Sequence, residues 1–264
     1  IDIYKLGYIG IRIYFNFIGT TPDDEREILN WLIKSKMIGV VGETTGNYNM
    51  VIHSWVKNLV QFHVFLKEFK HKFQSKITDL QYSTYLGTHF FSRNYLTKTY
   101  DDFYVYANGE NQEKIDKLDA QILLSITENS RKNVVEIADE LQKPVRTINH
   151  RLKQLVRKKI ILGFGANINT EKIGYEYYKI GFILSNNIDY KKLLRYARDN
   201  PNAVYVDETI GKYDYELNIE VGSAEELYRI VNDVKEITCG FKKTEIFQVK
   251  KFHKLTYNEI LESS

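Results

Sequence analysis

The stretch VGETTGNYN at positions 41–49 recurs as VDETIGKYD at positions 206–214. A second echo precedes each of them, because IDIYKLGY at positions 1–8 is matched by INTEKIGY at positions 168–175. The two echoes stand in the same order and lie 165 and 167 positions apart, which indicates an internal duplication. A repeat of this length sets the architecture of a chain and is considered before single motifs. The sequence therefore predicts two copies of one fold.

The second copy alternates strand and helix patterns. Apolar and polar residues alternate between Tyr213 and Val221, which is typical of a strand with one buried face. Ser223 and Glu226 have the spacing of a capping box at a helix start. The expected elements are strands at 177–184, 204–210, 213–221 and 237–252, with helices at 189–200 and from 223 onward. The order β-α-β-β-α-β is that of a ferredoxin-like plait.

The first copy gives the same order. Thr21 and Pro22 begin a helix whose first turn is acidic, which favours the helix dipole. Apolar residues spaced three and four apart indicate an amphipathic helix at 59–73. The expected strands are 8–18, 40–45, 48–55 and 77–91, with a hairpin turn at Gly46-Asn47. Because two divergent copies predict one element order, both are expected to be plaits.

A connector and a helical unit lie between the copies. Residues 97–114 are rich in turn-forming residues and hold one expected short strand at 103–107. Apolar stripes then indicate three helices, the first over 115–126, the second capped at Asn133 and the third over 145–159. Residues 160–168 are expected to form a β-wing. Three such helices followed by a wing are typical of a winged helix-turn-helix.

The predicted fold class is α+β, with two ferredoxin-like (βαββαβ) plait domains flanking a winged helix-turn-helix domain. The domains are expected at 1–96, 115–168 and 169–264, with 97–114 as the connector. A single cysteine, Cys239, excludes a disulfide framework and a cysteine-based zinc site and favours a reducing cytoplasm. No apolar run reaches the length of a membrane span, so we expect no membrane partner.

The positive charge of the chain is concentrated on one helix. Residues 143–159 hold seven lysines and arginines and no acidic residue. Residues 115–168 carry ten cations and six anions, a surplus of four, whereas the whole chain has a net charge of +3, so the remainder is slightly acidic. A basic helix is often only a solvated face. The third helix of a helix-turn-helix, however, fits the DNA major groove, where its cations replace phosphate counterions.

We therefore expect double-stranded DNA as a partner of this helix. Four residues near its N-terminal end are predicted to face the bases: Arg146, Thr147, Asn149 and His150. Four cations further along are predicted to contact phosphates: Arg151, Lys153, Arg157 and Lys158. Arginine can donate two hydrogen bonds to guanine, and asparagine can pair with adenine. His150 has the alternative interpretation of an ordinary surface histidine.

In these segments the chain resembles the Lrp/AsnC family of transcription regulators. The resemblance is carried by KLDAQIL at 117–123, VEIA at 135–138, TINHRLKQL at 147–155 and IILGF at 160–164. It continues with GKYDY at 211–215, which looks like the Gly-x-Tyr-Asp turn of that family. The family joins a winged DNA-binding domain to a ferredoxin-like effector and assembly domain, called RAM. Residues 115–258 resemble one such module, and residues 1–96 resemble a second RAM domain.

The chain departs from the family pattern at three places. Gln142 and Pro144 stand where the family usually has glycine in the turn and serine before the recognition helix. Asn49 replaces the aspartate of the turn in the first copy, which weakens the expectation of effector binding there. Because residues 5–8 match the segment that follows the wing in the second copy, we also expect a further winged domain to be encoded upstream.

The resemblance also implies a small-molecule effector, such as an amino acid, and pairing of RAM domains through their sheets. The candidate effector-binding residues are Gly46, Tyr48, Gly211, Tyr213 and Asp214. RAM pairing is expected within the chain, as a covalent pseudo-dimer, or in a homo-oligomer.

Two other functions stay open from the sequence. Siroheme decarboxylases share the winged and plait architecture, and that resemblance implies His, Tyr and Arg near the plait hairpin. Neither hairpin, at 43–48 or 208–213, holds His or Arg, and His53 stands alone nearby. The other alternative is an effector-sensing assembly module without DNA binding. No nucleophile elbow, phosphate loop or metalloprotease motif is present, so we expect no catalytic residue, no cofactor and no metal.

Overall fold

The computed structural model describes residues 1–97, 104–108, 111–185, 188–256 and 261. The first plait, residues 9–91, has the predicted order. Its elements are β1 (Ile9–Phe17), α1 (Pro22–Lys34), β2 (Ile38–Gly46), β3 (Met50–Val56), α2 (Leu59–Phe73) and β4 (Ile77–Phe91). The second plait, residues 176–255, repeats it after a short 3-10 helix, η1 (Glu171–Ile173). Its elements are β6 (Glu176–Leu184), α7 (Tyr190–Asp199), β7 (Ala203–Gly211), β8 (Tyr215–Val221), α8 (Ala224–Ile237) and β9 (Phe241–Leu255).

Strand registers confirm the duplication. Ile13 of β1 pairs with Ile52 of β3, and Ile180 of β6 pairs with Leu217 of β8. These pairs are related by the same shifts of 167 and 165 positions that relate the sequence echoes. The two plaits therefore agree residue by residue, as well as in element order.

Local signals in the sequence explain where the helices begin. Thr21 caps α1 in a capping box with Asp24, and Pro22 occupies its first turn, where no amide hydrogen is needed. Ser223 caps α8 by accepting from the amide of Glu226. The expected reciprocal contact is shifted by one residue, because the Glu226 carboxylate accepts from the amide of Gly222 rather than from Ser223.

The last strand of each plait leaves its own plait and joins the other. The first half of β4 pairs with β1 and its second half with β7. In the same way β9 pairs first with β6 and then with β2. Since β1 also pairs with β3 and β4, the strands close into a ring in the order β1-β3-β2-β9-β6-β8-β7-β4. The two plaits thus pair within the chain, as a β-barrel.

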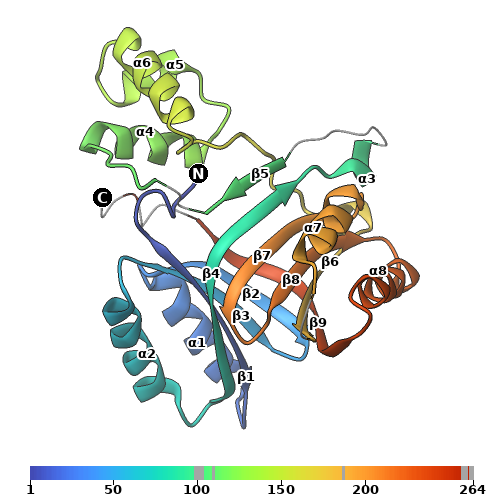
Figure 1. Cartoon of the computed structure of the whole chain (residues 1–264). Coiled ribbons are helices and arrows are strands. Elements are labelled where there is room, and N and C mark those ends of the chain that lie inside the picture. The colour runs from blue at the N-terminus through green and yellow to red at the C-terminus, as the bar shows by residue number, and fades with distance from the viewer. Residues whose placement is uncertain (98–103, 109–110, 186–187, 257–260, 262–264) are drawn as a thin grey trace.

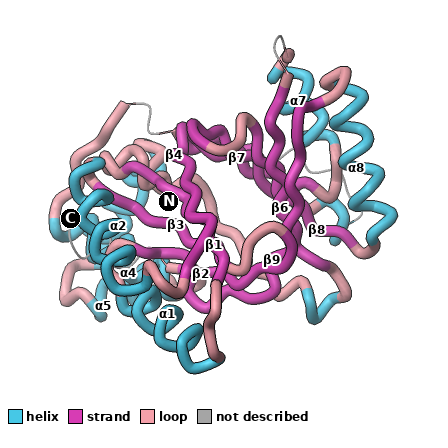
Figure 2. Tube along the Cα trace, turned by 90° about the horizontal axis from the view of Figure 1, so that it is seen from below, coloured by secondary structure: helices cyan, strands magenta, loops and turns pink. Residues whose placement is uncertain are grey.

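The helices cover the barrel from outside. Figure 2 shows α1 and α2 on one side of the strands and α7 and α8 on the other. The core beneath α2 is aromatic, because Phe65 and Phe69 stack on Trp31 of α1. The polar face of β8 is also buried, since every residue of this strand is shielded from solvent. The prediction of one buried face for β8 is therefore wrong: barrel closure places its polar residues in the interior.

The helical unit has the three predicted helices, α4 (Lys117–Glu128), α5 (Val134–Glu140) and α6 (Val145–Arg157). Gln142 adopts the left-handed conformation (φ +51°), in the turn where the family that the chain resembles usually has glycine. The expected β-wing is not observed, because none of residues 160–168 forms a strand. The strand of the connector, β5 (Tyr104–Ala107), pairs with β4 and follows the short helix α3 (Asn94–Thr97); Phe103 lies outside the described residues.

The N-terminal segment, residues 1–8, packs against the helical unit. Ile3 and Leu6 share one apolar core with Ile148 and Leu155 of α6. The amide of Asp2 donates to the carbonyl of Ile160 at 2.8 Å. The Lys5 ammonium donates to the carbonyl of Lys158 at 2.9 Å, where a cation also favours the helix dipole. The helical unit is therefore anchored to the first plait, although it precedes the second plait in sequence.

Replacing Gly211 by alanine is expected to destabilise the chain by about 1–3 kcal/mol. Gly211 has a φ of +146°, and an added Cβ would lie 2.7 Å from the carbonyl oxygen of Tyr82 in the other plait. Gly165→Ala is the matched control, since nothing lies within 4 Å of its added Cβ. Urea unfolding of both variants measures the difference, and equal stabilities would contradict the close approach of hairpin and strand.

Candidate nucleic-acid interface

The basic helix α6 is amphipathic in the expected way. Ile148 and Leu155 are buried on its inner side, while Val145 begins it directly after Pro144. Five of the eight predicted DNA-binding residues are exposed together on its outer side: Arg146, Asn149, His150, Lys153 and Arg157. Their spacing of three and four residues forms one stripe along the helix. Figure 1 shows α5 and α6 at the end of the molecule that lies away from the plaits.

This stripe carries positive charge without a neutralising partner among the described ion pairs. Arg146, Lys153 and Arg157 take part in none of the salt bridges that the described residues form. Thr147 is half-buried beside the stripe. Exposed, uncompensated cations next to Asn and His are the groups that contact DNA phosphates and base edges.

Arg151 and Lys158, by contrast, lie on the inner side of α6. The guanidinium of Arg151 is 2.8 Å from the carboxylate of Asp116 and 3.2 Å from that of Asp119, at the start of α4. Hydrogen bonding from the Asp119 amide, with Arg151 adding to it, lowers the pKa of Asp116. Lys158 pairs with Glu113 at 3.0 Å. These two cations line a shallow cavity of about 270 Å³ and are paired with acids, Arg151 at the start of α4 and Lys158 on the segment before it, which sets them apart from the six other predicted DNA-binding residues.

The candidate effector residues lie where the hairpin tips meet the opposite plait. Gly46 and Gly211 both have positive φ values and touch backbone atoms of the other plait's last strand. Tyr48 and Tyr213 are buried and join Tyr14 in an aromatic cluster inside the barrel. Structural contacts therefore occupy these four residues.

Asp214 is exposed, as are Gly46 and Gly211, whereas Tyr48 and Tyr213 are buried. Its carboxylate accepts from the amide of Leu184 at 2.8 Å, at the end of β6. Asn49 holds the equivalent place in the first plait, and its side-chain oxygen accepts from the amide of Phe17 at 2.9 Å. The exchange of Asp for Asn thus keeps the same strand-end contact.

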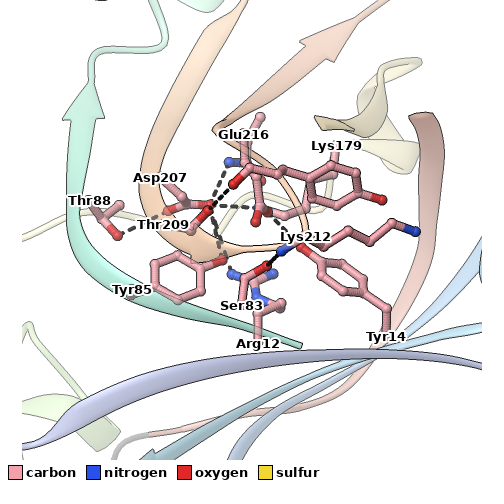
Figure 3. A network of polar contacts seen from close by, with 12 residues as sticks. Arg12, Tyr14, Ser83, Tyr85, Thr88, Lys179, Asp207, Thr209, Lys212 and Glu216 are labelled. Atoms are coloured by element: carbon pink, nitrogen blue, oxygen red, sulfur yellow. Dashed lines mark hydrogen bonds and ion pairs between the residues drawn. The ribbon is translucent and has the colours of Figure 1, made fainter. Parts of the chain in front are cut away.

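A network of buried charges fills the interior of the barrel (Figure 3). The Asp207 carboxylate lies 2.6 Å from the Lys179 ammonium, and Lys179 lies 2.8 Å from Glu216. The hydroxyls of Tyr85 and Thr88 also donate to Asp207, at 3.3 and 3.0 Å. Burial alone would raise the pKa of Asp207, but Lys179 and Arg12 hold it at about 2. These side chains fill the interior as structural groups, and among them Glu216 was expected on the solvated face of its strand.

His53 is packed rather than poised for chemistry. Its ring lies between those of Trp55 and Tyr85, each 4.7 Å away. Burial, helped by the charge of Arg12, holds the pKa of His53 well below its usual range. The described residues contain no group of three or more His, Cys, Asp or Glu that could hold a metal ion. None of the described helices is long and apolar enough to cross a membrane.

Comparison with known proteins gives three findings. The family described as winged helix-turn-helix DNA-binding matches residues 115–161. A protein of Pyrococcus furiosus, described as an uncharacterized HTH-type transcriptional regulator, is 33% identical over 131 residues, which cover 50% of this chain and 88% of that protein. The structure of Escherichia coli AsnC is similar over 56% of this chain and 99% of its own, with 22% identity and a TM-score of 0.49.

A fourth similarity extends over the whole chain. The structure of the siroheme decarboxylase NirDL covers 98% of this chain and 78% of its own, with 12% identity and a TM-score of 0.63. At this identity the likeness concerns the fold alone. It matches both plaits and the helical unit between them as one arrangement.

Acid should weaken the barrel through Asp207. Since the pKa of this carboxyl is lowered from 3.8 to about 2, its stabilisation is present above pH 3.8 and is lost as the pH falls toward 2. The free energy of unfolding is expected to fall by about 2 kcal/mol from this group alone. Urea unfolding from pH 5 downward, compared with Asp207→Asn, should show the gap between the two proteins narrowing below pH 4. A gap that stays constant with pH would contradict it.

Proposed function

The chain belongs to the Lrp/AsnC-like family of HTH-type transcriptional regulators, and on that premise we propose that it regulates transcription by binding double-stranded DNA through the outer face of α6. The observation that carries the proposal is the exposed stripe of Arg146, Asn149, His150, Lys153 and Arg157, which no acidic residue of the helix interrupts. Arg146, Thr147, Asn149 and His150 would face bases, and the cations nearer the C-terminal end would face phosphates.

The barrel is proposed to act as the assembly part of the regulator. Because β4 joins β7 and β9 joins β2, one chain supplies both halves of a RAM pair. A small effector, such as an amino acid, is the finer part of the proposal. It would engage the exposed surface around Asp214, since Tyr48 and Tyr213 are enclosed in the barrel. A shift of the thermal unfolding midpoint with single amino acids, lost in Asp214→Ala, tests that part.

Binding to DNA is expected to weaken steeply with salt. Each phosphate contact contributes about one log unit of affinity per log unit of salt concentration. Lys153→Ala and Arg157→Ala should each weaken binding to every sequence and lower the salt slope by about 1. Arg146→Ala and Asn149→Ala should instead cost about 1–3 kcal/mol only on the preferred sequence. Fluorescence anisotropy on sequences selected from random DNA measures both effects.

Arg151→Ala is the matched comparison on the same helix. Because Arg151 joins α6 to the start of α4, its loss should lower the stability of the helical unit and leave the salt slope unchanged. A slope that falls as it does for Lys153→Ala would place Arg151 on DNA. Affinity that is flat with salt for the wild-type chain would overturn the proposed function and leave the assembly module without DNA binding.

The siroheme decarboxylase alternative has a direct test. The fold likeness over nearly the whole chain favours this alternative. The packing of His53 between aromatic rings counts against it, because that side chain is buried. Purified protein is expected to leave the absorbance spectrum of an added tetrapyrrole unchanged. A stoichiometric spectral shift would favour the decarboxylase.

A further inference from the structure

The duplication lets each residue of one plait be matched with a residue of the other. Tyr14 pairs with Gln81 between β1 and β4, and Gly181 pairs with Glu245 between β6 and β9. Gln81 and Glu245 are therefore equivalent positions. Arg12 precedes Tyr14 by two residues, and Lys179 precedes Gly181 by two residues. The same register therefore makes these two interior cations equivalent.

The buried acids do not follow this symmetry. Val41 pairs with Ile52 in the first plait, as Val206 pairs with Leu217 in the second, which fixes the neighbouring equivalences. The first plait has Gly42 and Val51 where the second plait has Asp207 and Glu216. Each plait thus brings one cation into the barrel, but the second plait alone brings both carboxylates of the network.

The buried hydrogen bonds that reach a carboxylate across the two plaits run in one direction. The Tyr14 hydroxyl of the first plait donates to Glu216 at 2.6 Å, and Tyr85 and Thr88 of the first plait donate to Asp207. Arg12 adds a cation 4.0 Å from the same Asp207. In this network, every hydrogen bond to a carboxylate that crosses between the plaits therefore has its donor in the first plait and its acceptor in the second. Lys179 and Asn218 donate to Asp207 from within the second plait.

We infer that the two pairing surfaces are complementary to each other and not to themselves, so that each plait accepts only an unlike plait as its partner. Within this network, pairing of unlike plaits encloses two cations and two carboxylates. Glu245 is buried as well, but it is paired with Lys212 of its own plait. Two first plaits would enclose two arginines without an acid, and two second plaits would enclose four carboxylates against two lysines. Uncompensated charge in a closed interior is costly, so the pairing of two first plaits and the pairing of two second plaits are both disfavoured. The inference does not depend on DNA binding.

Each disfavoured pair can be imitated inside one chain. Val51→Glu gives the first plait an acid at the position equivalent to Glu216, so the barrel then resembles a pair of second plaits. Val51→Gln is the control of equal shape without the charge. The folding equilibrium constant from urea unfolding at pH 7 is expected to be on the order of 100-fold lower for the Glu variant than for the Gln variant. Equal constants would overturn the inference.

A double variant that moves the acid from position 216 to position 51 separates the effect of charge balance on stability from the effect of side-chain shape. In the double variant Val51→Glu with Glu216→Gln, the number of buried acids returns to that of the wild type, so most of the stability lost in Val51→Glu is expected to return. A double variant no more stable than Val51→Glu alone would overturn the inference.

A second set of variants imitates a pair of first plaits and leaves Val51 unchanged. It therefore tests the inference even if both Val51 variants fail to fold. Asp207→Asn with Glu216→Gln makes the interior resemble a pair of first plaits, with Arg12 and Lys179 uncompensated. Adding Arg12→Gln removes one of these charges and is expected to raise the folding equilibrium constant at least tenfold. A further loss on adding Arg12→Gln would show that the cation does not act through charge balance and would overturn the inference.

Discussion

The buried ammonium of Lys179 is the constraint on which the arrangement of the barrel depends. Its side chain is 1% exposed and lies between the carboxylates of Asp207 and Glu216. An ammonium removed from water must be compensated by nearby negative charge, and the two carboxylates must in turn be satisfied by donors. The first plait supplies those donors through Tyr14 and Tyr85, among others. Closing the barrel and satisfying the buried charges are consequently one event, which ties the two halves of the duplicated chain together.

The element order could be predicted from the sequence because its signals are local. Capping residues, three- and four-residue spacing and strict alternation all act within one helix or strand, and the long strand at 77–91 was predicted with the bounds that β4 has. Strand neighbours are not local. Nothing within β4 itself indicates that its second half pairs with β7, whose paired residues lie 115 to 128 positions later in the chain. The expected wing likewise needed a pairing that the local sequence does not specify, and residues 160–168 form no strand.

The functional residues show the same limit. Helical spacing placed Arg146, Lys153 and Arg157 on one exposed face of α6. It could not separate Arg151 from them, because its partners Asp116 and Asp119 belong to another helix. The sequence did contain a signal for the pairing of Arg151: Asp116 and Asp119 stand three residues apart at the start of the helix that packs on the basic helix. In the plaits, alternation alone assigned Glu216 to water, whereas barrel closure gives both faces of β8 an interior.

The N-terminal segment gives the regulator a fixed geometry. The Lys5 ammonium donates to the carbonyl of Lys158 at the end of α6, and Ile3 and Leu6 share its core, so packed side chains as well as the chain itself join α6 to the first plait. In the DNA complex proposed above, α6 would bind with its position relative to the barrel already set, which lowers the entropic cost of docking.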